Sequence, residues 1–386
     1  MQNSEALGSL ILARIIYAVN WLNVGAIFYL MSSDVGAGVS GLGIVTASFY
    51  LGIGIIQVPG GLLAARYGPK RIVVIGIFLS SLSALATSMV STIPELTVLR
   101  FLVGAGMAFI FAPGVVLVAR LLGGGKSGMG VGLFNSAFNI GGLLAIFGWI
   151  VIATSTGWRP SIALGGGLGI LTGLLVVLFV PRDESTPEVR ISRAALFAIV
   201  RDRQLVLLGL GTLGFGIGNT IVSGFMVYYL NRDLGVEGAV AGLVASLITV
   251  IPIFTALWGG RVYDTISRHR IVMVLALVGS AGSLALAASP SIYSSIACSA
   301  LGGVVSGFGF TFAFAGARDL NRAGAEYDSL AIAWVNSISL TGSFLPPVFF
   351  SSVAALLGYS QAWLWSAVLT LAFLPPVLFM VERWGR

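Results

Sequence analysis

GLLAARYGPKR, residues 61–71, is a glycine-bracketed loop with three cations that lies between two long apolar runs. A related stretch, GRVYDTISRHR, occupies residues 260–270, which is 199 positions further along the chain. At this spacing Gly61 corresponds to Gly260, Ala65 to Asp264 and Arg71 to Arg270. Each copy follows the second apolar run of its half of the chain, so the pair indicates a duplicated membrane domain.

The composition around these loops is that of a membrane protein. Of the 386 residues, 57% are hydrophobic and only 9% are charged, and the mean hydropathy is +1.00. Soluble domains carry about 25% charged residues, which excludes an ordinary soluble fold. The 52 glycines exceed the usual share of about 7%, and small residues allow membrane helices to approach closely.

Twelve apolar runs are each long enough to cross a bilayer, which takes about 20 residues. The runs are continuous rather than alternating, which disfavours a β-barrel, and an all-α integral membrane protein with 12 transmembrane helices is predicted. The predicted spans are 7–31, 39–65, 71–91, 94–120, 127–154, 159–181, 204–230, 238–263, 270–289, 291–317, 328–357 and 360–381. Prolines at 59, 113, 252, 346 and 347 are expected to interrupt their spans.

The distribution of lysine and arginine predicts the orientation. With the N-terminus inside, 17 of the 21 cations lie in inner loops or the C-terminal tail, two (Arg159, Arg232) lie in outer loops, and two (Arg14, Arg100) lie within spans. Both termini are therefore predicted to be cytoplasmic, in a multi-pass protein of the cytoplasmic membrane. The net charge of +7 comes from cations in short loops between spans, where they set the topology, so no nucleic-acid partner is expected.

The duplication extends along the whole chain. Asn20 corresponds to Asn219 at a spacing of 199, and Asn135 to Asn336 at 201. Residues 182–203 form the one substantial hydrophilic linker, with room for an interfacial helix over 191–201. We therefore predict an N-terminal six-helix bundle at 1–181, a cytoplasmic linker at 182–203, and a C-terminal six-helix bundle at 204–386, the two bundles being related by pseudo-twofold symmetry.

No catalytic centre, cofactor or metal site is predicted. The single cysteine, Cys298, lies inside an apolar run and has no partner for a disulfide. The single histidine, His269, is assigned to an inner loop, and each of the 14 acids to a loop, a terminus or a helix end. Proton relays usually need buried Asp, Glu or His, so proton coupling through a protein carboxylate is disfavoured.

These features resemble the major facilitator superfamily of secondary transporters. Its loop motif has the form G-x-x-x-D-R-x-G-x-R/K-R/K, and Gly61, Arg66, Gly68, Lys70 and Arg71 match it, with Ala65 in place of the Asp. The second copy keeps Gly260, Asp264 and Arg270, with Arg268 beside them, but has Thr265 and Ser267 at motif positions. Arg100-x-x-x-Gly104-x-Gly106 resembles the R-x-x-x-G-x-G motif of the family's fourth span.

The resemblance implies gating by these loops, with contacts that close the cytoplasmic side of the outward-facing state. By the repeat, Asp264 would face the start of the fifth span near residues 125–127, where a helix N-terminus favours an anion. Ala65 removes the equivalent contact in the first half. We expect the closing contact, here called the latch, to be made mainly by Asp264 in the second half of the chain. Alternatively, the charge of Asp264 only sets the membrane topology.

The resemblance also implies that spans one, four, seven and ten line a central cavity. Candidate substrate contacts there are Arg14, Tyr17, Asn20, Asn23, Arg100 and Asn219. Each has a structural alternative. Arg14 could snorkel to the inner interface, Arg100 could be tied to backbone carbonyls or to Glu95, and the asparagines could bond between helices.

The predicted function is secondary or facilitative transport of a small polar organic solute, with an anion among the candidates, by a monomer. The solute and the lipid bilayer are its expected partners. The alternative within the class is efflux of hydrophobic compounds through a cavity lined by Phe109, Phe111, Phe308, Phe310 and Phe312, with the arginines structural. An enzyme would need convergent His, Cys or carboxylate groups, and a sensor would need a soluble domain.

Overall fold

The structure is a computed structural model, and it describes residues 2–122, 127–181, 193–324 and 327–384. Within these residues, twelve helices are long and apolar enough to cross a membrane, which confirms the predicted all-α fold and the number of spans. Much of the predicted linker, residues 182–192, lies outside the described residues. Its remaining part includes the helix α9 (Arg193–Arg201).

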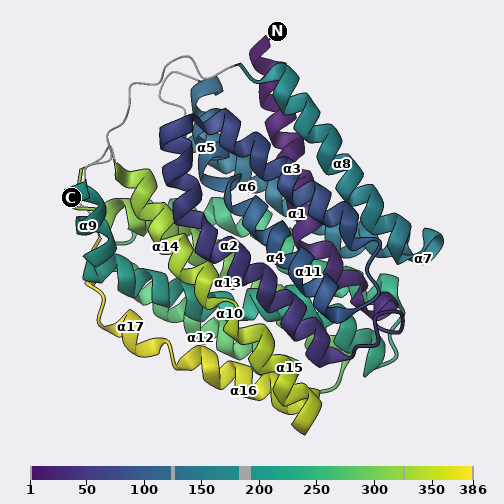
Figure 1. The fold of residues 1–386 in the computed structure, drawn as a ribbon. Coiled ribbons are helices and arrows are strands. Elements are labelled where there is room, and N and C mark those ends of the chain that lie inside the picture. The colour runs from purple at the N-terminus through teal and green to yellow at the C-terminus, as the bar shows by residue number, and fades with distance from the viewer. Residues whose placement is uncertain (1, 123–126, 182–192, 325–326, 385–386) are drawn as a thin grey trace. The chain divides into compact units, whose positions relative to one another are not determined.

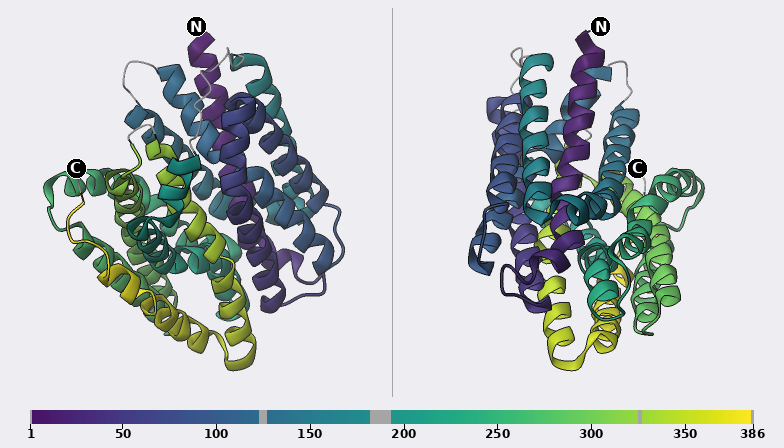
Figure 2. Two further views of the ribbon diagram at one scale, coloured as in Figure 1. Left: turned by 60° about the vertical axis from the view of Figure 1, so that its left-hand side comes forward. Right: turned by 90° about the vertical axis from the view of Figure 1, so that its right-hand side faces the viewer.

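The chain forms two compact units (Figure 1). Unit 1 comprises the described residues of 1–37 and 48–190, and unit 2 those of 38–47 and 191–386, so the first part of α2 groups with unit 2. In each unit the helices run alongside one another for most of their length (Figure 2).

Unit 1 contains most of the first six spans. In it α1 packs against α6 and α8, and α3 packs against α4 and α8. The helices, with α2 shared between the units, are α1 (Gln2–Met31), α2 (Val39–Tyr67), α3 (Pro69–Thr87), α4 (Ile93–Ala108), α5 (Phe111–Leu122), α6 (Ser127–Leu143), the π-helical turn η1 (Leu144–Gly148), α7 (Trp149–Thr156) and α8 (Trp158–Phe179).

Unit 2 contains the last six spans. In it α13 packs against α10, α11 and α12, while α14 and α16 lie against α10 and α12 respectively. The helices after α9 are α10 (Arg203–Arg232), α11 (Gly238–Thr265), α12 (His269–Ala287), α13 (Ile292–Leu320), α14 (Asp328–Gly342), α15 (Leu345–Leu357), α16 (Tyr359–Leu371) and α17 (Leu374–Leu378).

The backbone repeats between the units at joints that need glycine. Gly36 and Gly235 lie in the loop that follows the first span of each half, with φ of 65° and 66°, a conformation that costs L-residues energy. Gly157 and Gly358 precede α8 and α16 with φ of 91° and 86°. Their spacings of 199 and 201 are those of the sequence repeat, so the local geometry was duplicated with the sequence.

Proline interrupts only some of the spans in which it occurs. The fourth span breaks between α4 and α5, just before Pro113, and the eleventh breaks before Pro346, because proline lacks an N–H and clashes with the preceding turn. Pro59 and Pro252 instead lie inside the continuous helices α2 and α11. The expectation of an interruption was therefore wrong at these two positions.

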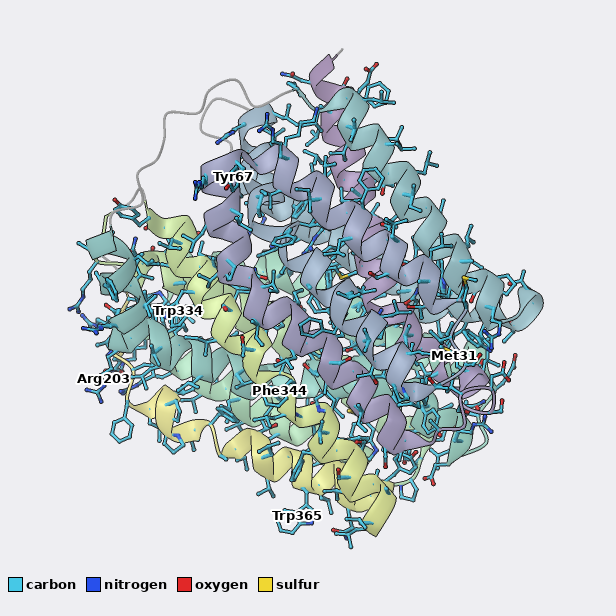
Figure 3. The ribbon with its side chains drawn as sticks, viewed as in Figure 1. Met31, Tyr67, Arg203, Trp334, Phe344 and Trp365 are labelled. Atoms are coloured by element: carbon cyan, nitrogen blue, oxygen red, sulfur yellow. The ribbon has the colours of Figure 1, made fainter. Side chains whose placement is uncertain are left out.

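Many large apolar side chains are exposed in both units, as expected of helices that span a membrane. Leu178 is 73% exposed and Leu356 is 82% exposed, and Trp365 projects away from α16 (Figure 3). With the twelve spans, this surface identifies a multi-pass membrane protein.

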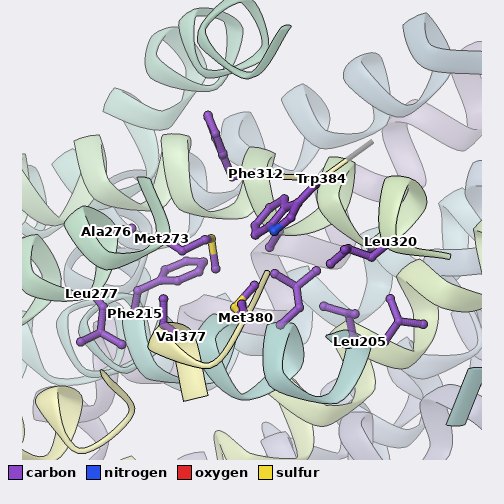
Figure 4. Close-up of a cluster of buried hydrophobic side chains, with 14 of the residues drawn as sticks. Leu205, Phe215, Met273, Ala276, Leu277, Phe312, Leu320, Val377, Met380 and Trp384 are labelled. Carbon is purple, nitrogen blue, oxygen red and sulfur yellow. The ribbon is translucent and has the colours of Figure 1, made fainter. Parts of the chain in front are cut away.

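The core of unit 2 extends to the C-terminal segment (Figure 4). Trp384 is buried there, and its ring stacks on His269 at 5.4 Å between centroids. The backbone N–H of Trp384 donates to Nδ1 of His269 over 3.3 Å. His269, predicted to lie in a loop, is instead the buried first residue of α12. The prediction was wrong because the helix begins one residue before the predicted span 270–289, and the C-terminal segment then buries this residue.

Candidate functional site

Arg14, on α1, lies in an aromatic cage within unit 1. The Cζ atom of its guanidinium is 4.2 Å from the ring centroid of Tyr17, 4.9 Å from that of Phe111, and 4.8 Å from those of Phe134 and Phe138. The electron-rich faces of the rings attract the cation and replace part of the hydration that it loses on burial. The cage joins three helices, α1, α5 and α6.

The cage leaves hydrogen-bonding capacity unused. The Arg14 side chain is 4% exposed, so it does not snorkel to an interface, and that alternative was wrong. Among the described residues, Nε and Nη1 of Arg14 have no hydrogen-bond partner. A buried cation with unpaired N–H groups is costly unless an acceptor reaches it. Chemically, these two N–H groups can donate to an anion.

Arg100, on α4, is held by the backbone. Its Nη1 donates to the carbonyl of Asn20 over 2.7 Å and its Nη2 to the carbonyl of Trp21 over 2.8 Å. Its Cζ also lies 4.6 Å from the ring centroid of Phe49. Arg100 thus ties α4 to α1 through backbone carbonyls, which is the structural alternative given above.

Glu95 is not the partner of Arg100. Its carboxylate accepts the N–H groups of Ser91 and Thr92 over 2.9 Å and 3.2 Å, and Thr92 in turn accepts the N–H of Glu95. This reciprocal pattern is a capping box, which satisfies otherwise unpaired N–H groups where a helix begins. Glu95 therefore stabilises the start of α4.

Asn20 and Asn23 lie against α8, whereas Arg14 lies against α5 and α6. Asn20 donates through Nδ2 to the carbonyl of Gly165 on α8 over 3.1 Å. A Cβ atom at Gly165 would come within 2.6 Å of Oδ1 of Asn20 and 3.4 Å of Nδ2 of Asn23. Both asparagines are 2% exposed. They pack α1 against α8, so the structure does not bring them to the Arg14 cage.

Asn219 occupies a separate position in unit 2. It is half-buried on α10, and its Nδ2 donates to Oγ of Ser306 on α13 over 3.3 Å. It links the seventh and tenth spans. Of the six predicted substrate contacts, the structure therefore groups only Arg14 and Tyr17.

The residues of the first loop motif divide into structural and exposed members. Gly68 has a φ of 92° before Pro69, which explains a glycine at this position. Lys70 donates to the carbonyls of Val177, over 3.0 Å, and Val180 at the end of α8. A Cβ atom at Gly61 would meet open space, and Arg66 lies over the ring of its neighbour Tyr67. Arg71 is exposed.

The second loop shows a shifted correspondence. Arg270 donates through Nη1 to the carbonyls of Leu378 and Met380, over 3.1 Å and 3.2 Å. Its counterpart by contact is therefore Lys70. The alignment of Arg71 with Arg270 was wrong by one residue, because α12 begins nine residues after Gly260 whereas α3 begins eight residues after Gly61. Arg268 pairs with Glu382 over 3.5 Å.

Asp264, the centre of the expected latch, is exposed near the end of α11, and Gly260 has open space beside it. Residues 125 and 126 of the expected partner segment lie outside the described residues. The latch stays a prediction.

The five phenylalanines proposed to line an efflux cavity serve separate packing contacts. Phe111 belongs to the Arg14 cage, Phe310 packs on Phe215, and Phe312 is fully buried against Tyr263. Phe109 packs near Gly60 and Gly76, and Phe308 near Gly259. Within neither unit do these phenylalanines come together to line one cavity, as the efflux alternative expected.

Sequence reasoning missed the residues that complete the Arg14 cage from α6, Phe134 and Phe138. They lie more than 100 residues from Arg14, and phenylalanine in an apolar span carries no signal of its partner. Trp21 was not among the predicted substrate contacts either. In the structure it contacts Tyr17, Phe49, Tyr50 and Phe138, with centroid distances of 5.6, 4.9, 5.9 and 5.4 Å.

Comparison with known proteins is consistent with this architecture. The family model of the Major Facilitator Superfamily matches residues 10–216 and 208–384. The chain is 24% identical over 345 residues to a nitrite extrusion protein of Bacillus subtilis, covering 88% of this chain and 84% of the relative. It is 27% identical over 275 residues to a probable galactarate/D-glucarate transporter of Escherichia coli, covering 62% and 61%.

Among solved structures, one similar fold is that of a bacterial homolog of the human lysosomal transporter Spinster, in an inward-facing and unoccupied conformation. The TM-score is 0.76 at 15% sequence identity, over 100% of this chain and 99% of that chain. At this identity the likeness concerns the fold alone.

Proposed function

Because the chain belongs to the major facilitator superfamily, we propose that it is a secondary transporter that moves a small anionic organic solute across the cytoplasmic membrane by alternating access. The observation that carries the proposal is Arg14, a buried guanidinium with two nitrogens that lack a partner among the described residues. An anionic group of the solute would supply the missing acceptors.

The balance of buried charge favours an anion over a cation. Arg14 and Arg100 are buried, whereas no aspartate or glutamate is among the buried side chains of the described residues. A cationic solute would meet fixed positive charge with no buried carboxylate to offset it. The named substrates of the two relatives above, nitrite and galactarate or D-glucarate, are anions as well.

Arg14 is a better anion ligand than Arg100. Both terminal nitrogens of Arg100 already donate to carbonyls of α1, so turning them toward a solute would break the tie between α4 and α1. Arg14 has no such bond to lose from Nε and Nη1. We therefore assign Arg14 to the solute and Arg100 to the scaffold of unit 1.

The test is uptake into proteoliposomes that contain the purified protein. The probes are radiolabelled acetate, succinate and benzoate, neutral glucose, and the lipophilic cation tetraphenylphosphonium, each with and without a pH gradient. We expect saturable uptake of at least one carboxylate and none of glucose or the cation. Hydrogen bonds to charged groups contribute about 1.5–3 kcal/mol, so Arg14→Gln should raise KM for that carboxylate by about 10- to 150-fold.

Arg261→Gln is the matched control, because it removes the same charge from an exposed position on α11. Arg14→Lys keeps the charge and should retain part of the uptake, which guards against loss of uptake through misfolding. Uptake of glucose or the cation without any carboxylate would overturn the proposal. Unchanged carboxylate uptake by Arg14→Gln would do so too.

A further inference from the structure

We propose that the solute is an aromatic monocarboxylate, with its carboxylate on Arg14 and its ring against Phe138 and Trp21. This inference rests on the proposed function and narrows it to one chemical class. Three observations within unit 1 carry it: the partly exposed rings beside the guanidinium, the predominantly aromatic side chains around it, and the hydrogen bonds that already occupy the second buried arginine.

The rings around Arg14 differ in how much of their surface is already covered. Tyr17 and Phe134 are buried, at 4% and 1% exposure, and form the closed walls of the cage. Phe111 and Phe138 are only half-buried. An anion that reaches Nε or Nη1 of Arg14 would therefore bring the rest of its molecule against rings that still have surface to cover.

Trp21 extends this accessible surface along α1. It is half-buried, and its ring centroid lies 5.4 Å from that of Phe138 and 5.6 Å from that of Tyr17. The Trp21 and Phe138 rings are nearly perpendicular, at 79°. A planar ring beside them could stack on one and meet the edge of the other, the two arrangements that aromatic pairs prefer.

The same surroundings disfavour a polyhydroxylated acid. Each of the four side chains in contact with the Arg14 guanidinium is aromatic, and Tyr17 alone among them carries a polar atom. Hydroxyl groups of a sugar acid would lose water there without gaining enough partners, which costs affinity. Asn20 and Asn23 do not supply them, because they face α8.

A second carboxylate would also lack a cation. Among the described residues, Arg14 is the one buried arginine with unpaired nitrogens. Arg100 is engaged with the carbonyls of Asn20 and Trp21. An additional buried charge without a partner is strongly unfavourable, so a monocarboxylate fits better than a dicarboxylate.

The test compares ligands that share the carboxylate and differ in the ring. Binding of benzoate, cyclohexanecarboxylate, terephthalate and D-glucarate to the purified protein is measured by calorimetry, and each compound then competes with labelled benzoate for uptake. Cyclohexanecarboxylate has similar bulk and no π face, so an apolar surface alone would bind it at least as well. We expect benzoate to bind about 3- to 10-fold more tightly, with terephthalate and D-glucarate weaker still.

The variants Phe138→Leu and Trp21→Leu should each reduce the preference for benzoate over cyclohexanecarboxylate toward onefold. Phe138→Tyr, which keeps a ring, should retain it and also reports on folding. Phe197→Leu is the matched control, since Phe197 is an exposed ring on α9 in unit 2, and it should change nothing.

The outcomes separate the inference from the proposed function. Equal affinity for benzoate and cyclohexanecarboxylate, or a preference that survives both leucine variants, would overturn the aromatic class while carboxylate transport through Arg14 still stands. Tighter binding of D-glucarate than of benzoate would do the same. If no carboxylate is bound or transported, the proposed function itself fails.

Discussion

Lys70 and Arg270 make the same contact, each within its own unit. Each side chain stands in the first turn of the third helix of its half and donates to two backbone carbonyls where the last helix of that half ends. Carbonyls at a helix C-terminus are unpaired and carry partial negative charge, which a cation stabilises. The basic loops therefore join the third and sixth spans of each half, in addition to any part they have in gating.

Replacing either cation should destabilise its unit. We expect Lys70→Met and Arg270→Met each to lower the free energy of unfolding by about 1 kcal/mol, below the usual range for hydrogen bonds to a charged group because both contacts are partly exposed to solvent. Thermal unfolding in detergent measures this. Arg71→Met, an exposed neighbour, is the control, and an equal loss in that variant would contradict the assignment.

Two glycines set the distance between α2 and α4. A Cβ atom at Gly104 would lie 2.2 Å from the carbonyl oxygen of Phe49, and one at Gly52 would lie 2.3 Å from that of Phe101. Such contacts require a glycine on each helix. Gly104→Ala should cost about 1–3 kcal/mol through overpacking, measured as a lower unfolding midpoint.

Gly61→Ala provides the control, on α2, the helix that Gly104 of α4 packs against. An added methyl group there meets open space, and alanine is favoured over glycine in a helix by about 0.5–1 kcal/mol. This variant should be neutral or slightly more stable. A loss equal to that of Gly104→Ala would show that the close approach is not the cause.

The two buried arginines should respond oppositely to the same substitution. Arg100→Gln removes two hydrogen bonds between α4 and α1, so we expect a stability loss of about 1.5–3 kcal/mol with little change in KM for the solute. Arg14→Gln removes a buried cation with unpaired nitrogens, so the solute-free protein should lose little stability or gain some, while KM rises. Parallel measurements of unfolding and uptake test this contrast, and the reverse pattern would exchange the two roles.

The C-terminal segment should be docked through Trp384. A Cβ atom at Gly316 would come 2.4 Å from the Trp384 ring, so Gly316→Val should displace the ring from His269. Trp384→Ala removes a large buried side chain and should cost about 3–5 kcal/mol. Limited proteolysis near the C-terminus measures release of the segment; resistance equal to that of the parent protein in both variants would contradict the docking.

The sequence alone was enough for the membrane class, the twelve spans, the family resemblance and the internal repeat. Hydropathy is a local property of about 20 residues, and a duplicated loop is visible wherever it falls. The sequence also singled out Arg14 and Arg100, because a charge inside an apolar run is costly and therefore conspicuous.

Only the tertiary structure decided what those residues contact. Arg14 meets rings from α5 and α6, Arg100 meets carbonyls of α1, and Asn20 turns to α8. The one-residue shift that pairs Lys70 with Arg270 was likewise hidden in the alignment of two loops. Each of these contacts depends on how a helix is rotated about its axis and which helix it packs against, and apolar spans with nearly uniform hydropathy leave that rotation undetermined until the side chains are packed.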